Sequence, residues 1–389
     1  MWRGRPTWAE IDLDAVAHNV RELKQLIGSA ELLAVVKANA YGHGAVMVAK
    51  TALENGAKWL GVACTDEGVQ LRQAGFACPI LVFGYVPPWE AETIVSHRLT
   101  PTVNTRQLAL ALSAISSAQG VVTPVHVKVD TGLTRYGLLP HEILDFARGL
   151  LTLPNLRLEG LYTHFATADE TDKSYVHQQL RAYRDTLKRF EDEGIRISLR
   201  HAANSGATLD LPESWMDMVR CGISIYGLYP SEHVNRRVKL RPVMSLKTQV
   251  SRVRQIPEGV SVSYGRTYTT RSHSTLAAIS IGYADGLSRA HSNEGNVLVG
   301  GHRVPIVGRV CMDQCVVDVS SVPNVQQGDE VVVIGRQGDG EITADEIARQ
   351  LGTINYEITC AVSARVPRAY VRHGKIIAAE TLTDSSPLL

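Results

Sequence analysis

Lys37 is the first residue whose type and position suggest a chemistry of its own. It ends the apolar run Leu32 to Lys37 (LLAVVK), and the glycine-rich turn Tyr41-Gly42-His43-Gly44 follows it. A lysine amine can form a Schiff base with a carbonyl compound. A solvated lysine at a strand end is the alternative, because charged side chains are mostly exposed. The apolar run and the turn weaken that alternative, but this motif alone leaves both open.

The elements that would position Lys37 repeat along the first 230 residues. A short apolar run rich in β-branched residues, a turn and an amphipathic stretch alternate there, which is typical of βα units. The amphipathic stretches predict helices, for example at Asp14 to Ile27, His43 to Asn55 and Tyr175 to Glu193. Expected N-terminal caps lie at Thr65-Asp66-Glu67 and Asn104-Thr105.

The apolar runs number eight, which is a natural closure number for a barrel of parallel strands. The sequence therefore predicts an N-terminal (β/α)8 TIM-type barrel, with catalytic residues at the carboxyl ends of its strands. An open doubly wound sheet is the competing architecture, and the lack of a Gly-x-Gly-x-x-Gly motif after the first run disfavours it. The eight runs are Leu32 to Lys37, Trp59 to Ala63, Ile80 to Gly84, Thr100 to Val103, Val125 to Asp130, Leu158 to Thr163, Ile197 to His201 and Met218 to Ile223.

The sequence changes character from about Lys239 onward. Alternating apolar and polar residues, with turn residues between them, predict a mostly β C-terminal domain. One helix is expected at Thr343 to Leu351, which begins with a sequence that resembles a capping box. A chain of 389 residues exceeds the roughly 250 to 300 at which one core stops growing. We expect an α/β protein with the barrel at 1–237, the β-rich domain at 238–380 and a tail at 381–389.

The composition restricts the class of partner. The 40 Lys and Arg residues nearly balance the 39 Asp and Glu residues, which gives no electrostatic footprint for nucleic acid or an anionic membrane. No run approaches the roughly 18 apolar residues of a membrane span, and the start has no apolar core of signal-peptide length. We therefore expect a cytoplasmic protein with a small-molecule substrate, without a metal, nucleic-acid or membrane partner.

The stretch VVKANAYGHG, which contains Lys37, closely resembles the cofactor-lysine motif of bacterial alanine racemases. The resemblance spans nearly the full length, because eight further motifs follow in the order of that family. It implies a two-base racemase that interconverts L- and D-alanine on pyridoxal 5'-phosphate and supplies D-alanine for cell-wall peptidoglycan. The further motifs begin at Val129, Thr163, His201, Arg220, Val262, Gly282, Gly308 and Ile354.

The resemblance also implies which residues bind the cofactor. Lys37 would form the Schiff base, and Arg220 would face the pyridine nitrogen. Since arginine keeps its proton under ordinary conditions, the ring nitrogen would stay unprotonated, and the cofactor would be a weaker electron sink than with a carboxylate partner. The phosphate would rest on the hydroxyls of Ser205, Tyr41 and Tyr356 and on the backbone N–H groups of Gly222 and Ile223, which matches the site that barrels often build after strands 7 and 8. The implied cofactor-binding set is Lys37, Tyr41, His164, Asn204, Ser205, Arg220, Gly222, Ile223 and Tyr356.

The two proton-transfer groups implied by the resemblance are Lys37 and Tyr264. A free phenol has a pKa of about 10, so Tyr264 would need help from a chain through His164 to Arg220. In the family a head-to-tail homodimer joins the two bases across the subunit boundary. Met312 would donate its backbone N–H to the substrate carboxylate with Arg135 nearby, while Tyr283 and Tyr356 would narrow the entrance.

One segment departs from the family pattern. Where the family commonly has Asp-Thr-Gly-Met-Gly-Arg, this chain has threonine at position 134, which we expect to stiffen the loop before Arg135. Lys128 matches a lysine that is carbamylated in several members, and an ordinary ion-paired lysine is the alternative.

Three other functions remain to be weighed against racemisation of alanine. A related barrel-type amino-acid decarboxylase would usually face the pyridine nitrogen with glutamate, so Arg220 and the Cys-Met-Asp-Gln motif argue against it. A single-barrel cofactor carrier would lack the β domain that contains Tyr264 and Met312. A racemase of serine or of broad amino-acid specificity stays open.

Overall fold

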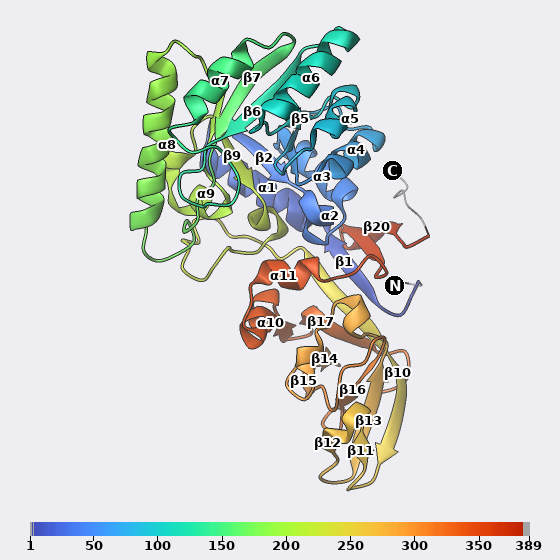
Figure 1. The fold of residues 1–389 in the computed structure, drawn as a ribbon. Helices are drawn as coiled ribbons and strands as arrows, with labels where there is room; N and C mark the ends of the chain where they lie inside the picture. The colour runs from blue at the N-terminus through green and yellow to red at the C-terminus, as the bar shows by residue number, and fades with distance from the viewer. Residues whose placement is uncertain (1, 3, 384–389) are drawn as a thin grey trace. The chain divides into compact units, whose positions relative to one another are not determined.

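The computed structural model describes residue 2 and residues 4–383, so residues 384–389 of the expected tail lie outside the described part. The chain forms two compact units (Figure 1). The first comprises residues 15–40 and 48–242. The second comprises the described residues of 1–14, 41–47 and 243–389.

Eight parallel strands form the first unit and confirm the predicted barrel. Five of them pair in the order β5-β4-β3-β2-β9, and three pair in the order β6-β7-β8. A parallel bridge between Thr102 and His126 joins the two sets on one side, and the hydrogen bond from Arg220 N to Ala203 O (3.0 Å) joins them on the other. The strands are β2 (Glu31–Val35), β3 (Trp59–Val62), β4 (Ile80–Val82), β5 (Thr100–Pro101), β6 (Thr123–Lys128), β7 (Leu156–Tyr162), β8 (Leu199–His201) and β9 (Met218–Cys221).

Helices connect these strands, and their amphipathic sequences explain how they pack. The longest of them buries Val176, Leu180, Tyr183 and Phe190 on one face, at the spacing of helical turns. Thr105 caps its helix as predicted, whereas Thr65 is already the first helical residue and Cys64 occupies the cap position. The right-handed helices are α1 (Leu13–Ile27), α3 (Ala45–Glu54), α4 (Thr65–Gln73), α5 (Ala91–Ser96), α6 (Arg106–Gln119), α7 (Ile143–Leu151), α8 (Ser174–Asp192) and α9 (Ser205–Asp210), with 3-10 turns at η1 (Pro88–Glu90), η2 (Pro212–Ser214) and η3 (Ile223–Tyr226). The segment labelled α2 (Lys37–Tyr41) is a left-handed turn.

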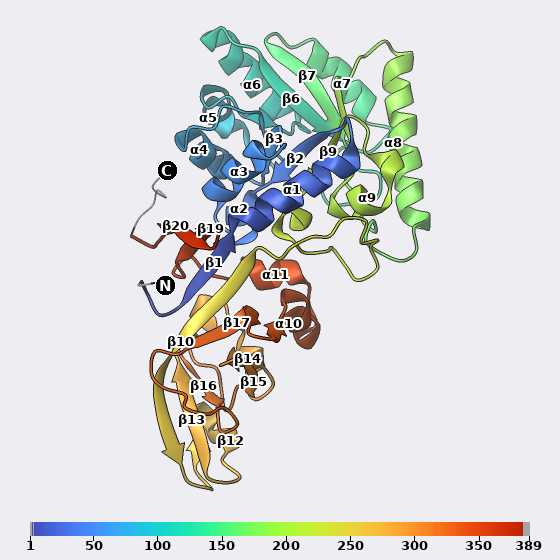
Figure 2. The same cartoon turned by 180° about the vertical axis from the view of Figure 1, so that it is seen from behind.

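The second unit is mostly β, as predicted. Its main sheet has the order β15-β14-β17-β10-β1-β19-β20, and β10 also pairs with β13, beside which it runs in Figure 2. The strands are β1 (Trp8–Asp12), β10 (Met244–Ile256), β11 (Ser261–Val262), β12 (Tyr268–Thr269), β13 (Ser274–Ile279), β14 (Asn296–Val299), β15 (His302–Pro305), β16 (Cys315–Asp318), β17 (Glu330–Gln337), β18 (Gly340–Ile342), β19 (Arg368–Arg372) and β20 (Lys375–Glu380).

The N-terminal strand belongs to this β-rich unit. β1 is antiparallel to β10 and parallel to β19, so residues 8–12 complete a sheet whose other strands come from the end of the chain. The sequence-based boundaries at 1–237 and 238–380 therefore divide the chain differently from the two compact units. The physical reason is that hydrogen bonding to β10 and β19 assigns β1 to this sheet, although it is far from both in sequence.

Short helices complete the second unit. α10 (Ala344–Leu351) begins where it was expected, and Thr343 caps it by accepting a hydrogen bond from Glu346 N at 3.0 Å. α11 (Asn355–Cys360) follows, and 3-10 turns lie at η4 (Tyr264–Arg266), η5 (Tyr283–Asp285) and η6 (Arg289–His291). Among the described residues, no helix combines the length and apolarity needed to cross a membrane.

Candidate active site

Lys37 lies two residues beyond the end of β2, where it begins an unusual turn. The next four residues, Ala38 to Tyr41, all have left-handed backbone angles, with φ between 50° and 54°. This conformation costs non-glycine residues roughly 1–2 kcal/mol each, so the surrounding structure must hold it. The turn therefore redirects the chain directly after Lys37.

Glu67 fixes the start of this turn. Its two carboxylate oxygens accept hydrogen bonds from Ala38 N (2.6 Å) and Ala63 N (2.7 Å). The side chain comes from the first turn of α4, so a single carboxylate connects the residue after Lys37 with the end of β3. From the sequence, Glu67 was expected only as part of a helix cap. An acidic residue in the first turn of a helix that follows a barrel strand is the signal that could have singled it out.

Arg220, on β9, is buried and its guanidinium is almost fully hydrogen-bonded. Nη1 donates to His201 Nδ1 (3.1 Å) and to the His201 carbonyl (3.0 Å). Nη2 donates to the carbonyls of Thr163 (2.7 Å) and Ala202 (3.0 Å) and lies 3.3 Å from His164 Nδ1. Burial lowers the pKa of Arg220 to about 10, which still leaves it charged at neutral pH.

His164 is the neutral partner of Arg220. Burial, and then the charge of Arg220, hold the pKa of His164 well below its ordinary value. Because a guanidinium can only donate, Nδ1 of His164 must accept its hydrogen bond. The proton of the neutral ring is therefore on Nε2, which can donate to a further group.

Positive charge gathers around His164. Lys37, Lys128 and Arg135 each act on its ring electrostatically, in addition to Arg220. Burial, followed by repulsion from Arg135 and Arg220, lowers the pKa of Lys128 to about 8. An accumulation of cationic groups at the carboxyl ends of the barrel strands suits an anionic ligand.

Asp130 organises the loop that leads to Arg135. Its carboxylate accepts hydrogen bonds from the backbone N–H groups of Gly132 (2.9 Å), Thr134 (3.0 Å) and Arg135 (3.1 Å). Burial alone would raise the pKa of Asp130, but these donors bring it below the ordinary value. Thr134 has φ of 56°, so it keeps a backbone conformation that favours glycine.

The expected phosphate-binding residues of the barrel lie together. Ser205 Oγ accepts hydrogen bonds from Gly222 N (3.0 Å) and Ser224 N (3.5 Å), which places the start of α9 beside the turn η3 that contains Ile223. Asn204 caps α9 by accepting a hydrogen bond from Ala207 N at 3.0 Å. In the structure the side chain of Asn204 therefore stabilises the start of α9.

Tyr41 and Tyr356 meet within the β-rich unit, with ring centroids 5.9 Å apart. The segment after Tyr41 approaches α11 closely at Gly42, which has φ of 87°. A Cβ atom there would lie 2.2 Å from the carbonyl oxygen of Thr359. Arg368 Nε also donates to the Gly42 carbonyl at 3.0 Å. These contacts bring the two tyrosines together.

Tyr264 lies in a strained and exposed turn. Its side chain is 73% exposed, and its neighbours Ser263, Gly265 and Arg266 have φ of 63°, 71° and 52°. Ser263 Oγ donates to the carbonyl of Arg309 at 2.7 Å. This bond ties the turn to the segment that precedes Met312.

Met312 and Tyr283 lie on two loops joined by backbone hydrogen bonds. Tyr283 N donates to the Cys311 carbonyl and Ala284 N to the Met312 carbonyl, both at 3.0 Å. Within the described residues, the N–H of Met312 makes no hydrogen bond, so it remains a potential donor. Met312 and Tyr283 are 52% and 43% exposed.

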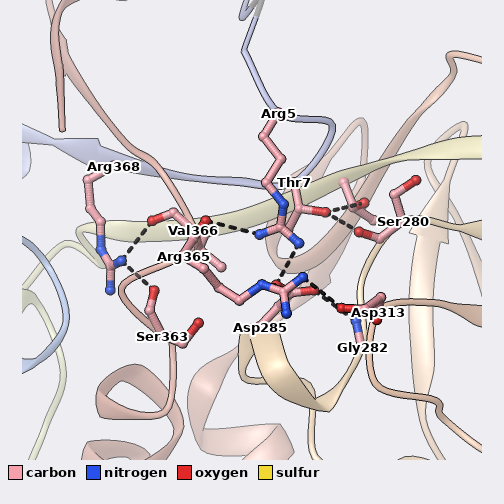
Figure 3. A network of polar contacts seen from close by, with 11 residues as sticks. Arg5, Thr7, Ser280, Gly282, Asp285, Asp313, Ser363, Arg365, Val366 and Arg368 are labelled. Atoms are coloured by element: carbon pink, nitrogen blue, oxygen red, sulfur yellow. Dashed lines mark hydrogen bonds and ion pairs between the residues drawn. The ribbon is translucent and has the colours of Figure 1, made fainter. Parts of the chain in front are cut away.

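A buried carboxylate supports these loops (Figure 3). Asp285 pairs with Arg5 at 2.7 Å and with Arg365 at 3.1 Å. Arg365 also binds Asp313, the residue after Met312, at 2.7 Å. Asp285 Oδ2 accepts the N–H of Gly282 at 3.1 Å. Two arginines from opposite ends of the chain thus fix the loops of Tyr283 and Met312, a support that the sequence analysis missed.

The predicted site residues therefore form two groups, one in each unit. Among the part of the chain that the structure describes, no cluster of His, Cys, Asp or Glu side chains is placed to hold a metal ion. The barrel unit contains Lys37, Lys128, Arg135, His164, Asn204, Ser205, Arg220, Gly222 and Ile223, and the β-rich unit contains Tyr41, Tyr264, Tyr283, Met312 and Tyr356.

Comparison with known proteins covers both units. Residues 11–230 match the alanine racemase N-terminal domain, and residues 243–370 match the alanine racemase C-terminal domain. The alanine racemase of Desulfovibrio desulfuricans is 49% identical over 368 residues, which are 94% of this chain and 98% of that protein. The chain belongs to the alanine racemase family.

Solved structures agree with this assignment. The alanine racemase of Bacillus anthracis, with bound L-Ala-P, has a TM-score of 0.92 and 41% sequence identity, covering 97% of this chain and 98% of that chain. The alanine racemase of Bartonella henselae, with covalently bound pyridoxal phosphate, has a TM-score of 0.85 and 30% identity, covering 95% of this chain and all of that chain.

Proposed function

We propose that this chain interconverts L-alanine and D-alanine with pyridoxal 5'-phosphate as its cofactor, and so supplies D-alanine for cell-wall synthesis. The observation that carries the proposal is the buried pair of a charged Arg220 and a neutral His164 at the strand ends of the barrel. A racemisation assay across a panel of L- and D-amino acids tests it. The panel includes serine, and a faster reaction with serine than with alanine would overturn the substrate assignment.

The donor set of the barrel fits the cofactor. Its phosphate is anionic, and cationic side chains gather around His164. Lys37 would hold the cofactor covalently. Ser205, Gly222 and Ile223 would hold its phosphate together with the hydroxyls of Tyr41 and Tyr356, which the β-rich unit contains. Asn204 would contact the cofactor as well. When bound, the cofactor withdraws electrons and makes the α-proton of the amino acid removable.

Arg220 would meet the ring nitrogen of the cofactor through Nε–H. In the described part of the chain both Nη atoms already donate to protein groups, and Nε–H makes no hydrogen bond. An arginine with a pKa of about 10 stays protonated at neutral pH and would leave that nitrogen without a proton. This arrangement favours return of the α-proton over transamination.

The proton on each face of the α-carbon would be moved by Lys37 and Tyr264. His164 carries its proton on Nε2, so it could stabilise the phenolate form of Tyr264 by donating a hydrogen bond. Because a free phenol is a weak acid, with a pKa of about 10, that stabilisation is what would let the side chain act as a base near neutrality.

The carboxylate of the substrate would be held by the N–H of Met312 and the guanidinium of Arg135. A backbone donor without another partner and a cation are both suited to a carboxylate. Tyr283 and Tyr356 would restrict the size of the side chain that enters, which favours alanine.

Lys128 would carry a carbamate. A pKa of about 8 leaves roughly a tenth of the amine uncharged at pH 7, and the uncharged amine adds to carbon dioxide with release of a proton. The resulting negative charge would pair with Arg135. A carbamate signal after incubation with ¹³C-bicarbonate, absent in Lys128→Met, tests this assignment, and an identical spectrum for both proteins would contradict it.

The enzyme would be a cytoplasmic homodimer with shared active sites. Support for the shared site comes from Tyr264, Met312 and Tyr283, which are large and exposed although their loops are firmly held. Mixing inactive Lys37→Ala and Tyr264→Phe proteins should restore partial activity after subunit exchange. Exchange without recovery would mean that each site is built within one chain.

A further inference from the structure

A second line of buried polar groups begins at Arg220 and leads to a carboxylate. Arg220 Nη1 lies 3.1 Å from His201 Nδ1, and His201 Nε2 lies 3.0 Å from His126 Nδ1. His126 Nε2 then lies 3.5 Å from an oxygen of Glu159, an electrostatic contact whose geometry does not make a hydrogen bond. Two histidines thus connect the guanidinium on β9 with a glutamate on β7.

The donors along this line can be assigned from chemistry. Arg220 has no acceptor, so His201 Nδ1 accepts, and the single proton of that neutral ring is on Nε2. Nε2 of His201 donates to His126 Nδ1, which leaves the proton of His126 on Nε2, facing Glu159. Burial lowers the pKa of both histidines, so both rings are neutral. Each step admits one tautomer.

The packing holds both rings in place. A Cβ atom at position 160 would lie 2.5 Å from His126 Nδ1, so Gly160 makes room for this ring on β7. The ring of Tyr162 stacks on His201 with centroids 4.7 Å apart and planes at 10°. The ring centroids of Trp59 and His126 lie 5.4 Å apart. Rotation of either imidazole would require these neighbours to move.

Glu159 is suited to anchor the line. Its side chain is 16% exposed, and its other oxygen accepts a hydrogen bond from Arg157 at 2.7 Å. The carboxylate can only accept, and its negative charge at 3.5 Å favours the tautomer of His126 that has its proton on Nε2. With that proton on Nδ1 instead, His126 and His201 would present two donors to each other. To avoid this clash, His201 would need its proton on Nδ1, where it would face the N–H groups of Arg220.

We propose that Glu159 is a positioning residue, which acts through His126 and His201 to hold the Arg220 guanidinium in one orientation. The consequence for the cofactor rests on the proposed function, because a fixed guanidinium presents Nε–H to the ring nitrogen. The line itself depends only on groups of the barrel.

The tautomers can be observed directly in the full-length protein labelled with ¹⁵N-histidine. We expect His126 and His201 to give the shifts of rings protonated at Nε2, with His126→Gln used to assign the signals. In Glu159→Leu we expect part of the His126 signal to move to the Nδ1-protonated form. Glu159→Gln keeps an acceptor oxygen and should restore the native pattern. A native His126 protonated at Nδ1, or Glu159→Leu without any change, would overturn the proposal.

Kinetics separate positioning from general stability. Glu159→Leu should lower kcat about tenfold and change KM less than about twofold, while Glu159→Gln should recover most of the rate. Glu10→Leu is the matched control, because Glu10 is a partly buried glutamate of β1 that accepts a hydrogen bond from Trp8 Nε1 at 3.0 Å and, within the described residues, binds no histidine. An equal loss of kcat in both leucine variants would reduce Glu159 to a structural role. If the native protein has the expected tautomers but does not racemise alanine, the proposed function is contradicted, while the positioning role of Glu159 toward Arg220 still holds.

Discussion

Arg220 and Tyr264 have opposite surroundings. Arg220 is buried in the barrel unit, and both of its Nη atoms donate to fixed acceptors. Tyr264 is largely exposed on a turn with three left-handed neighbours. A group that sets the charge of a site must be desolvated and immobile, whereas a group that completes the site from another surface must be presented outward. The comparison therefore sets a buried, hydrogen-bonded cation in the barrel unit against an exposed phenol in the β-rich unit.

Lys37→Ala should have the largest effect on the barrel side of this comparison. It removes the amine that would hold the cofactor, so racemisation should fall by more than about 10,000-fold. Borohydride reduction and peptide mapping of the native protein should place the pyridoxyl group on Lys37. Lys50→Ala, on α3, is the control and should keep the label. A label on Lys50 or Lys128 would assign the cofactor to a different amine.

Tyr264→Phe tests the exposed side. Racemisation should fall at least about 100-fold, because a proton donor and acceptor is lost, while thermal unfolding should not change, because the side chain is exposed. In deuterated solvent the variant should still exchange the α-proton of D-alanine through Lys37, but that of L-alanine only slowly. Tyr268→Phe removes a hydroxyl from the nearby strand β12; it is the control and should change neither quantity. Equal residual exchange from both enantiomers would show that Tyr264 does not serve the L-alanine face.

Glu67→Gln tests whether the turn after Lys37 needs its carboxylate. The amide keeps a single acceptor for two N–H groups, so kcat should fall about tenfold and the free energy of unfolding by about 1 kcal/mol. Asp66→Asn removes the same charge from the neighbouring exposed position and should change neither. Steady-state kinetics and urea unfolding measure both quantities. An unchanged Glu67→Gln enzyme would mean that the turn holds itself.

Thr134→Gly should have the smallest effect. Release of the left-handed threonine gains roughly 1–2 kcal/mol, and the entropy of glycine in the unfolded chain costs about 0.5–1 kcal/mol. The net result should be stabilisation by about 0.5–1 kcal/mol in urea unfolding. Thr134→Ala keeps the left-handed cost and should gain less. A destabilised glycine variant would show that the threonine side chain stabilises this loop.

The barrel could be predicted because parallel strands that are buried on both faces consist of nearly continuous apolar residues. It did not predict β1, since Trp8–Asp12 is short and its partners β10 and β19 lie more than 200 residues away. The turn after Lys37 contains no glycine at its left-handed positions, so the local sequence does not predict its backbone conformation. The contacts of Glu67 and Glu159 could not be predicted for a related reason. They depend on which backbone N–H group or imidazole ring the fold brings to each carboxylate.

The position of β1 between β10 and β19 has a consequence for synthesis on the ribosome. Trp8–Asp12 emerges first, but Arg368–Arg372 emerges roughly 350 residues later. At about 5–20 residues per second, that interval lasts on the order of 20 to 70 s. During this time the first strand has an open edge that could pair with another nascent chain. Asp285, which pairs with Arg5, also emerges late. Until then the charge of Arg5 remains unpaired by Asp285 and lies close in sequence to that edge.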